Sequence, residues 1–250
     1  IPMGWKGLLD ERLVASARVL TAEEVEPYRH RGGTVLGTSR ENPYSEKNIQ
    51  AGAPQRLCAN IQLLGLDALI TLGGDDTNGV SAKLYQEHPE FAIIGLPKTM
   101  DNDLNLPDGA STYGFDSFVE AAAEAVEHGV VDASSTDTLL VAEVFGRNAG
   151  FVAQAIGARV GAVRTLIPEE GDIDLAQLVQ EVANYYRGRP SKGGVIIVSE
   201  GIKIKRDFAN NAALLDEVFA QNPKARAAFE SIAELDQFGH PKLEDAALII

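Results

Sequence analysis

An α/β fold made of two Rossmann-like, doubly wound lobes is predicted by three features of this 250-residue sequence. Short apolar runs rich in β-branched residues alternate with helical patterns, which implies right-handed βαβ units. The runs are continuous, as in strands buried on both faces of a parallel sheet. Glycines, carboxylates and cations follow directly after the runs, where ligands bind in such sheets, at the carboxyl ends of the strands.

The elements follow in order along the chain. Strands are expected within residues 66–74, 91–97, 138–146, 162–169 and 194–201. Helices are expected after Pro54, where Leu57, Ile61 and Leu64 recur at helical spacing, and within residues 115–130 and 175–187. The stretch 105–114, "NLPDGASTYG", is the predicted hinge. It separates a first lobe, residues 1–113, from a second lobe, residues 114–250, and the active site is expected in the cleft between them.

Composition and charge exclude several classes of function. The net charge is −14, which argues against a nucleic-acid-binding or anionic-membrane surface, because both need clustered cations. No apolar run approaches the roughly 20 residues of a membrane span. The single cysteine, Cys58, cannot form an intrachain disulfide, so we expect a reducing, cytoplasmic setting.

The motif "GGDDTNG" follows the first predicted strand. Gly73 and Gly74 permit a tight turn and let backbone N–H groups approach an anion. Thr77 is expected to cap the following helix, whose N-terminus favours phosphate. Asp75 and Asp76 repel phosphate unless a metal intervenes, and a carboxylate together with phosphate oxygens is a usual environment for Mg²⁺. An exposed capping turn is the alternative interpretation.

The motif "GLPKTMDNDLN" follows the second predicted strand. Phosphoryl transfer to an alcohol needs a base for the hydroxyl, a metal, and positive charge where the transferring group becomes more negative. The carboxylates of Asp101 and Asp103, the ammonium of Lys98 and the hydroxyl of Thr99 supply these groups. An Asn/Asp-rich surface turn is the alternative. The pairing with "GGDD" on the preceding strand favours phosphoryl transfer.

Six motifs, in this order and spacing, resemble the phosphofructokinase family: "GGTVLGTSR", "GGDDTNG", "GLPKTMDNDL", "STYGFDSF", "VAEVFGRNAGF" and "VSEG". The likeness spans nearly the whole chain. Asp76 and Lys98 resemble the pyrophosphate-dependent branch, because the ATP-dependent enzymes commonly have glycine at both positions. The resemblance therefore implies transfer of a phosphoryl group from pyrophosphate to fructose 6-phosphate.

On the donor side, the resemblance implies that Asp101 is the general base for the sugar 1-hydroxyl. It further implies that Asp75 holds Mg²⁺ with help from Asp103. The residues that would bind the phosphate donor and set its identity are Gly74, Asp76, Thr77 and Lys98.

On the acceptor side, the resemblance implies that Thr99 contacts the transferring phosphate and that Arg40 bridges donor and acceptor. The sugar phosphate would be bound by Phe145, through its backbone, and by Gly146, Arg147 and Glu200. For Arg40 and Arg147 the alternative is a surface or ion-pair role, and for Glu200 a solvated strand end.

The chain also departs from the family pattern. A first strand with a glycine-rich donor loop and a final sugar-binding segment are absent, so we expect a fragment that is inactive by itself. Thr138 stands where the family often has an arginine that reaches a neighbouring subunit's sugar-phosphate site, so the identity of the sugar phosphate stays open. A homo-oligomer is expected at full length. The alternatives are an ATP-dependent sugar-phosphate kinase of the same family and a non-catalytic regulatory subunit.

Overall fold

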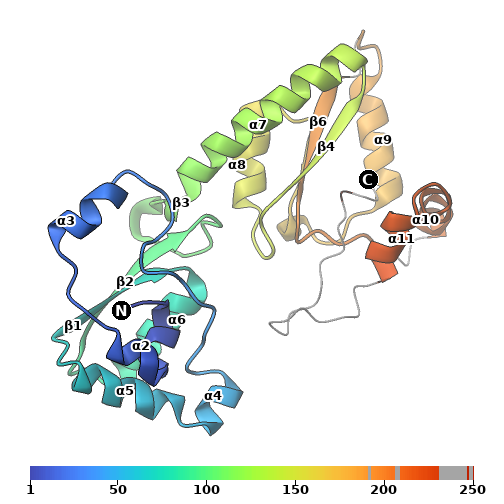
Figure 1. Cartoon of the computed structure of the whole chain (residues 1–250). Helices are drawn as coiled ribbons and strands as arrows, with labels where there is room; N and C mark the ends of the chain where they lie inside the picture. Colours follow the sequence, from blue (N-terminus) through green and yellow to red (C-terminus); the bar gives the residue numbers. More distant parts are fainter. Residues whose placement is uncertain (191–192, 206–208, 231–246, 248–249) are drawn as a thin grey trace. The chain divides into compact units, whose positions relative to one another are not determined.

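All five predicted strands and the predicted helices are confirmed by the computed structural model, which describes residues 1–190, 193–205, 209–230, 247 and 250 (Figure 1). The chain divides into two compact units, Ile1–Lys98 and Thr99–Ile250. The assignment of a donor lobe, residues 1–113, and a sugar-phosphate lobe, residues 114–250, stays a prediction. None of the helices in the described part of the chain combines the length and the apolar character that a membrane span requires.

The first unit places two parallel strands on a layer of helices. Its elements are α1 (Gly4–Leu9), α2 (Glu11–Ala15), α3 (Ala22–Val25), η1 (Glu26–Tyr28), α4 (Glu46–Gln50), α5 (Ala53–Leu63), β1 (Ala68–Gly73), α6 (Asp75–Glu87) and β2 (Ala92–Thr99). Strand β1 pairs with β2 in register from Ala68↔Ala92 to Gly73↔Pro97, so the two carboxyl ends lie side by side. The core beneath them contains Trp5, Leu8, Leu57, Ile61, Val80 and Leu84.

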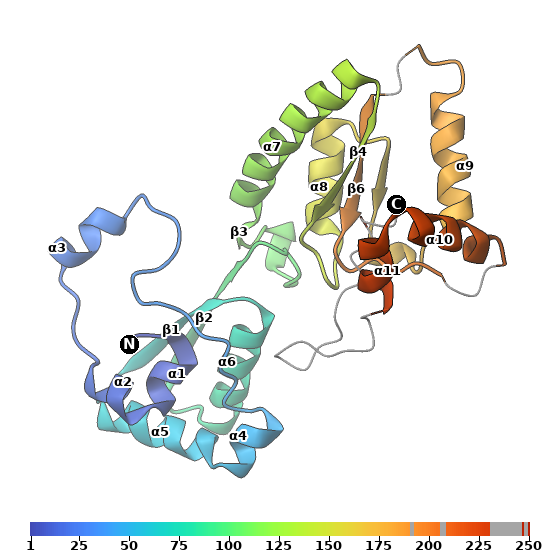
Figure 2. The same ribbon diagram turned by 45° about the vertical axis from the view of Figure 1, so that its right-hand side comes forward.

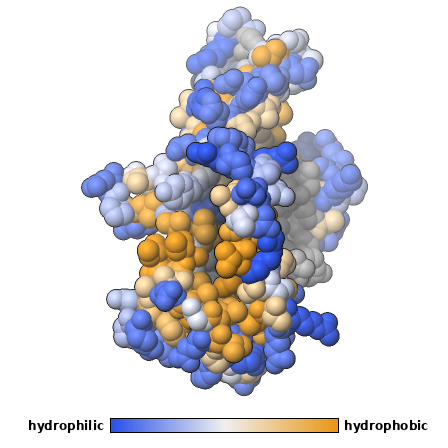
Figure 3. All heavy atoms as spheres, turned by 60° about the vertical axis from the view of Figure 1, so that its left-hand side comes forward, coloured by the Kyte–Doolittle hydropathy of each residue, from blue (hydrophilic) through white to orange (hydrophobic). Residues whose placement is uncertain are grey.

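The expectation that every strand is buried on both faces is wrong for β1 and β2. Side chains alternate across a strand, and here only one face packs on the helical core. On the other face, Ile70, Leu72 and Ile94 are 57%, 61% and 55% exposed. Figure 3 shows apolar side chains gathered over this lower, N-terminal part of the chain. The physical reason is that the core helices of this unit all pack on the same face of the two strands.

The second unit has a central strand, β6, that is buried from Val195 to Ser199. Its elements are η2 (Pro107–Gly109), β3 (Tyr113–Gly114), α7 (Phe115–Thr136), β4 (Leu139–Val144), α8 (Phe151–Val160), β5 (Arg164–Leu166), η3 (Pro168–Glu170), α9 (Leu175–Tyr186), β6 (Gly194–Ser199), α10 (Ala209–Gln221) and α11 (Pro223–Glu230). Strand β3 borders β2 in the order β1-β2-β3, and the second sheet has the parallel order β4-β6-β5.

Helices cover both faces of this second sheet, as a doubly wound fold requires (Figure 2). Val195 and Ile197 of β6 belong to the cluster that contains α7 and α8. Ile196 and Val198 belong to the cluster on the side of α9 and α10. The continuous apolar run of β6 therefore reflects burial on both faces, as predicted.

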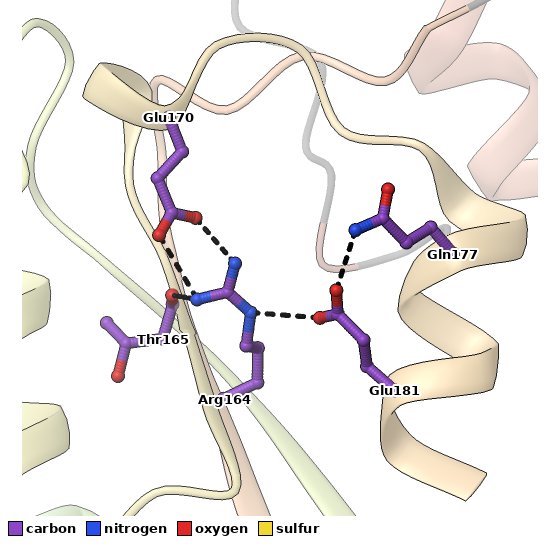
Figure 4. Close-up of polar contacts among 5 residues, drawn as sticks. All are labelled: Arg164, Thr165, Glu170, Gln177 and Glu181. Carbon is purple, nitrogen blue, oxygen red and sulfur yellow. Dashed lines mark hydrogen bonds and ion pairs between the residues drawn. The ribbon is translucent and has the colours of Figure 1, made fainter. Parts of the chain in front are cut away.

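An ion-pair network fixes β5 to the segments that follow it (Figure 4). The Arg164 guanidinium contacts Glu170 of η3 at 2.8 Å and Glu181 of α9 at 3.2 Å. The side-chain amide of Gln177 donates to the same Glu181 carboxylate at 2.8 Å. Close by in the chain, the Glu169 carboxylate accepts the N–H of Gly150, the N-cap residue of α8, at 2.8 Å.

Candidate active site

The turn between β1 and α6 places two carboxylates at a helix N-terminus. Gly74 is the N-cap of α6, and Asp75 and Asp76 lie exposed in its first turn. The side-chain amide of Asn78 donates to the carbonyls of Gly73 and Gly74 at 2.8 and 2.9 Å. This amide holds the turn in shape, a role that was not predicted from the sequence.

The expectation that Thr77 caps the helix is wrong. The helix begins at Asp75, two residues earlier, and Gly74 has the capping position without a side-chain hydrogen bond. The Thr77 side chain packs against the end of β1 instead. A Cβ added to Gly73 would lie 2.3 Å from the Thr77 hydroxyl oxygen. Gly73 therefore has to be glycine because Thr77 occupies the space next to it.

A polar hollow of about 220 Å³ adjoins the two carboxylates. It is lined by Asn42, Tyr44, Asp75, Asp76, Gly79, Val80 and Lys83. Tyr44 and Lys83 were missed in the sequence. For Lys83 a signal existed, because Asp75, Asp76, Gly79 and Lys83 recur at spacings of three and four, which puts them on one side of a helix.

The turn after β2 holds Asp101 in place. Lys98 is exposed on β2, whereas Thr99 is buried and Asp101 half-buried. The Thr99 hydroxyl donates to the Asp101 carboxylate at 3.1 Å and accepts the Asp101 N–H at 3.2 Å. Thr112 donates its hydroxyl to the Thr99 carbonyl at 2.7 Å and its N–H to the Asn102 side chain at 2.9 Å. The aspartate is therefore pre-oriented within the second unit.

A second turn in this unit is built on Gly146, at the carboxyl end of β4. The Ser199 hydroxyl donates to the Gly146 carbonyl at 2.5 Å, and the Gly201 N–H donates to the same oxygen at 3.2 Å. The Gly146 N–H lies 3.5 Å from the Glu200 carboxylate. Gly146 has a φ of +140°, a conformation that favours glycine.

The same turn brings together the predicted sugar-phosphate residues. Phe145 is 48% exposed and its ring meets Phe118 of α7 edge-on at 5.6 Å between centroids. Arg147 follows Gly146 and is half-buried, as is Glu200. The parallel register of Val144 with Ser199 explains the grouping, because it aligns the carboxyl ends of β4 and β6.

Two further predicted residues, Arg40 and Asp103, are exposed, one in each unit. Arg40 is exposed in the first unit and does not line the hollow. Asp103 is exposed, two residues beyond Asp101 in the second unit. Within the described residues, no group of three or more histidine, cysteine, aspartate or glutamate side chains is arranged to hold a metal ion. Mg²⁺ does not require such a group, because it is usually bound by one or two carboxylates together with phosphate oxygens and water.

Comparisons with known proteins identify the family of this chain. A family model described as "PFK: Phosphofructokinase" matches residues 1–249. A pyrophosphate–fructose 6-phosphate 1-phosphotransferase of Amycolatopsis methanolica is 35% identical over 96% of this chain and 60% of its own length. An ATP-dependent 6-phosphofructokinase of Corynebacterium efficiens is 33% identical over 95% of this chain and 59% of its own.

Solved structures are also similar. Phosphofructokinase of Pichia pastoris in the T-state superposes with a TM-score of 0.70 at 26% identity, over 81% of this chain and 22% of that one. A pyrophosphate-dependent phosphofructokinase of Nitrosospira multiformis gives 0.62 at 23% identity, over 74% and 47%, which supports the fold alone. The chain spans about 60% of the length of the first curated relatives that it matches.

Proposed function

Because this chain belongs to the phosphofructokinase family, we propose that it serves to transfer a phosphoryl group from pyrophosphate to the 1-hydroxyl of fructose 6-phosphate. The choice of pyrophosphate as donor rests on Asp76, whose carboxylate lies in the first turn of α6 and lines the hollow. A carboxylate there repels the additional phosphate of a nucleotide and restricts the space next to the donor. An ATP-dependent reaction is the second candidate, because an ATP-dependent relative is almost as similar.

The roles of the reacting side chains follow from their chemistry. The Asp101 carboxylate accepts the proton of the sugar 1-hydroxyl, and the Thr99 hydroxyl holds that carboxylate in one orientation. The sugar oxygen attacks the terminal phosphorus of pyrophosphate. The new oxygen–phosphorus bond forms, the bridging bond breaks, and inorganic phosphate leaves with its electron pair. The Lys98 ammonium stabilises the charge on the transferring group.

The carboxylates suit a magnesium diphosphate. Asp75 borders the hollow and is exposed, so it can offer an oxygen to Mg²⁺, with Asp103 assisting from the next motif. Bound Mg²⁺ would neutralise phosphate charge that Asp75 and Asp76 otherwise repel. Gly74 and Thr77 complete the donor turn, with Gly74 contributing its backbone.

The acceptor side of the proposal uses the turn on Gly146. Arg147 and Glu200 offer a cation for the sugar phosphate and an acceptor for a sugar hydroxyl, and Phe145 contributes its backbone. Arg40 would bridge donor and acceptor. A homo-oligomeric, cytoplasmic enzyme completes the proposal; its location rests on Cys58, the single cysteine.

The experiment compares kcat/KM for pyrophosphate and ATP in a protein that carries this chain at the full length of its relatives. The wild type should prefer pyrophosphate, and Asp76→Gly should improve the use of ATP. Lys98→Ala should lose about 2.7–4 kcal/mol of transition-state stabilisation, as other lost charge-stabilising donors do. Asp67→Gly, an exposed aspartate just before β1, is the matched control and should change neither donor. A wild type that prefers ATP would refute the choice of donor.

A further inference from the structure

Tyr44 lines the hollow beside Asp76, and its aromatic ring contacts the ammonium of Lys83. Among the residues that line this hollow in the described structure, no other is aromatic. The Lys83 ammonium lies over the Tyr44 ring, 4.5 Å from its centroid. The Tyr44 hydroxyl donates to the Glu87 carboxylate at 2.7 Å. Lys83 and Glu87 are one helical turn apart on α6, so one helix holds both ends of the tyrosine.

The remaining contacts of Tyr44 keep this arrangement in place. Its N–H donates to the Asn42 side chain at 2.9 Å, which fixes the backbone before it. The side chain is half-buried and packs against the core of the first unit. Burial, followed by the hydrogen bond to Glu87, raises the pKa of Tyr44 well above its ordinary value. The phenol therefore stays protonated and donates to Glu87.

A nucleoside donor and an inorganic donor would bind in this hollow through different interactions. A base binds by stacking on an aromatic face, whereas a diphosphate binds through cations and a metal. The ammonium of Lys83 covers ring surface that a base would use and adds positive charge beside two carboxylates. The contact of Lys83 with the Tyr44 ring thus disfavours a nucleoside donor and favours an inorganic diphosphate.

We propose that Tyr44, Lys83 and Glu87 form a donor-specificity element, in which Lys83 withholds the Tyr44 ring from a nucleoside and supports an inorganic diphosphate. The inference deepens the proposed function and rests on it. It assigns specificity to three residues beyond Asp76 and Lys98. These residues act on donor binding, and none of them touches the reacting oxygen of the sugar in the reaction proposed above.

The test uses two probes that separate stacking from charge. Binding of adenosine, which is uncharged, and of pyrophosphate with Mg²⁺ is measured by calorimetry on a protein that carries this chain at the full length of its relatives. Lys83→Met keeps an unbranched side chain that is one atom shorter and removes the charge. We expect adenosine to bind about tenfold more tightly, in the lower part of the range for base–aromatic stacking. We expect pyrophosphate to bind about fivefold more weakly, the upper end for one exposed charge pair.

Two further variants control the interpretation. Lys47→Met removes an exposed lysine of α4 that does not line the hollow, and it should change neither affinity. Tyr44→Ala added to Lys83→Met should abolish the gain for adenosine, because the stacking surface is gone. A role of Lys83 in stability alone would weaken both ligands together.

The inference is overturned if Lys83→Met does not gain affinity for adenosine, if both affinities fall together, or if the gain survives the loss of Tyr44. These results leave the proposed function untouched as long as the wild type binds pyrophosphate. A wild type that binds adenosine but shows no binding of pyrophosphate would overturn the proposed function itself, together with the inference that depends on it.

Discussion

Replacement of Gly146 by alanine should destabilise the turn that carries the candidate sugar-phosphate residues. An added Cβ would lie 2.5 Å from the Ala149 carbonyl oxygen and 2.5 Å from the Ser199 hydroxyl oxygen. The φ of +140° is a conformation that L side chains rarely adopt. Backbone strain of this kind costs about 1–3 kcal/mol, and overpacking costs about the same again. The sum is a loss of about 2–6 kcal/mol for Gly146→Ala.

A second glycine of the same unit supplies the matched control. Gly161 follows α8 with a φ of +64°, and nothing lies within 4 Å of an added Cβ. Gly161→Ala should therefore cost only the left-handed conformation, about 1–2 kcal/mol. The difference between the two variants reports the steric term at Gly146 together with any excess of its backbone strain over that at Gly161.

Urea unfolding followed by circular dichroism gives the free energy of unfolding of each variant. Amide hydrogen exchange gives a local readout, because the N–H groups of Glu200 and Gly201 donate to the carbonyls of Val144 and Gly146. Both amides should exchange faster in Gly146→Ala and at the wild-type rate in Gly161→Ala. Equal destabilisation by the two alanines, with unchanged exchange at residues 200 and 201, would refute the steric reasoning.

Three further predictions concern other parts of the chain. Asp101→Asn keeps the shape of the base but cannot take the proton, so kcat of the full-length enzyme should fall by roughly 10²–10⁴-fold with KM for fructose 6-phosphate nearly unchanged; normal turnover would remove the assignment. Leu84→Ala should cost about 2–5 kcal/mol in urea unfolding, whereas Leu72→Ala should cost less than about 1 kcal/mol, because Leu84 is fully buried and Leu72 is 61% exposed; similar losses would contradict the observed burial. Burial raises the pKa of the Cys58 thiol above its ordinary value, so the unfolded state loses this proton at a lower pH than the folded state. The free energy of unfolding should therefore fall as pH rises above about 9; Cys58→Ala should flatten that dependence, and an unchanged slope would contradict it.

Much of the fold could be predicted because its signals are local. The run "GVIIVSEG" predicts a buried strand, and β6 is buried on both faces. The five apolar runs and the helical patterns need only neighbours along the chain, as does the placing of motifs after strands. The candidate site residues were found in the same way, because the turns after β1, β2, β4 and β6 each carry a motif that the sequence displays directly.

The exposure of the second face of β1 and β2 could not be predicted in this way. Ile70 and Ile94 have the side chains of a core strand, yet both are more than half exposed. Whether a face is covered depends on which other elements pack on it, and no pattern within the strand encodes that. Thr77 was misjudged for a similar reason, since the start of α6 depends on the conformation of Gly74 and on the Asn78 amide.

The sequence by itself determined the α/β class, the order of strands and helices, and the turns that carry Asp75, Asp101, Gly146 and Glu200. Only the tertiary structure decided which residues surround those turns. Tyr44 meets Lys83 and Glu87 across about forty residues of chain, and Ser199 meets Gly146 across fifty-three. Contacts at such separations are set by strand register and helix packing, which depend on the whole fold and leave no periodic signal in the chain.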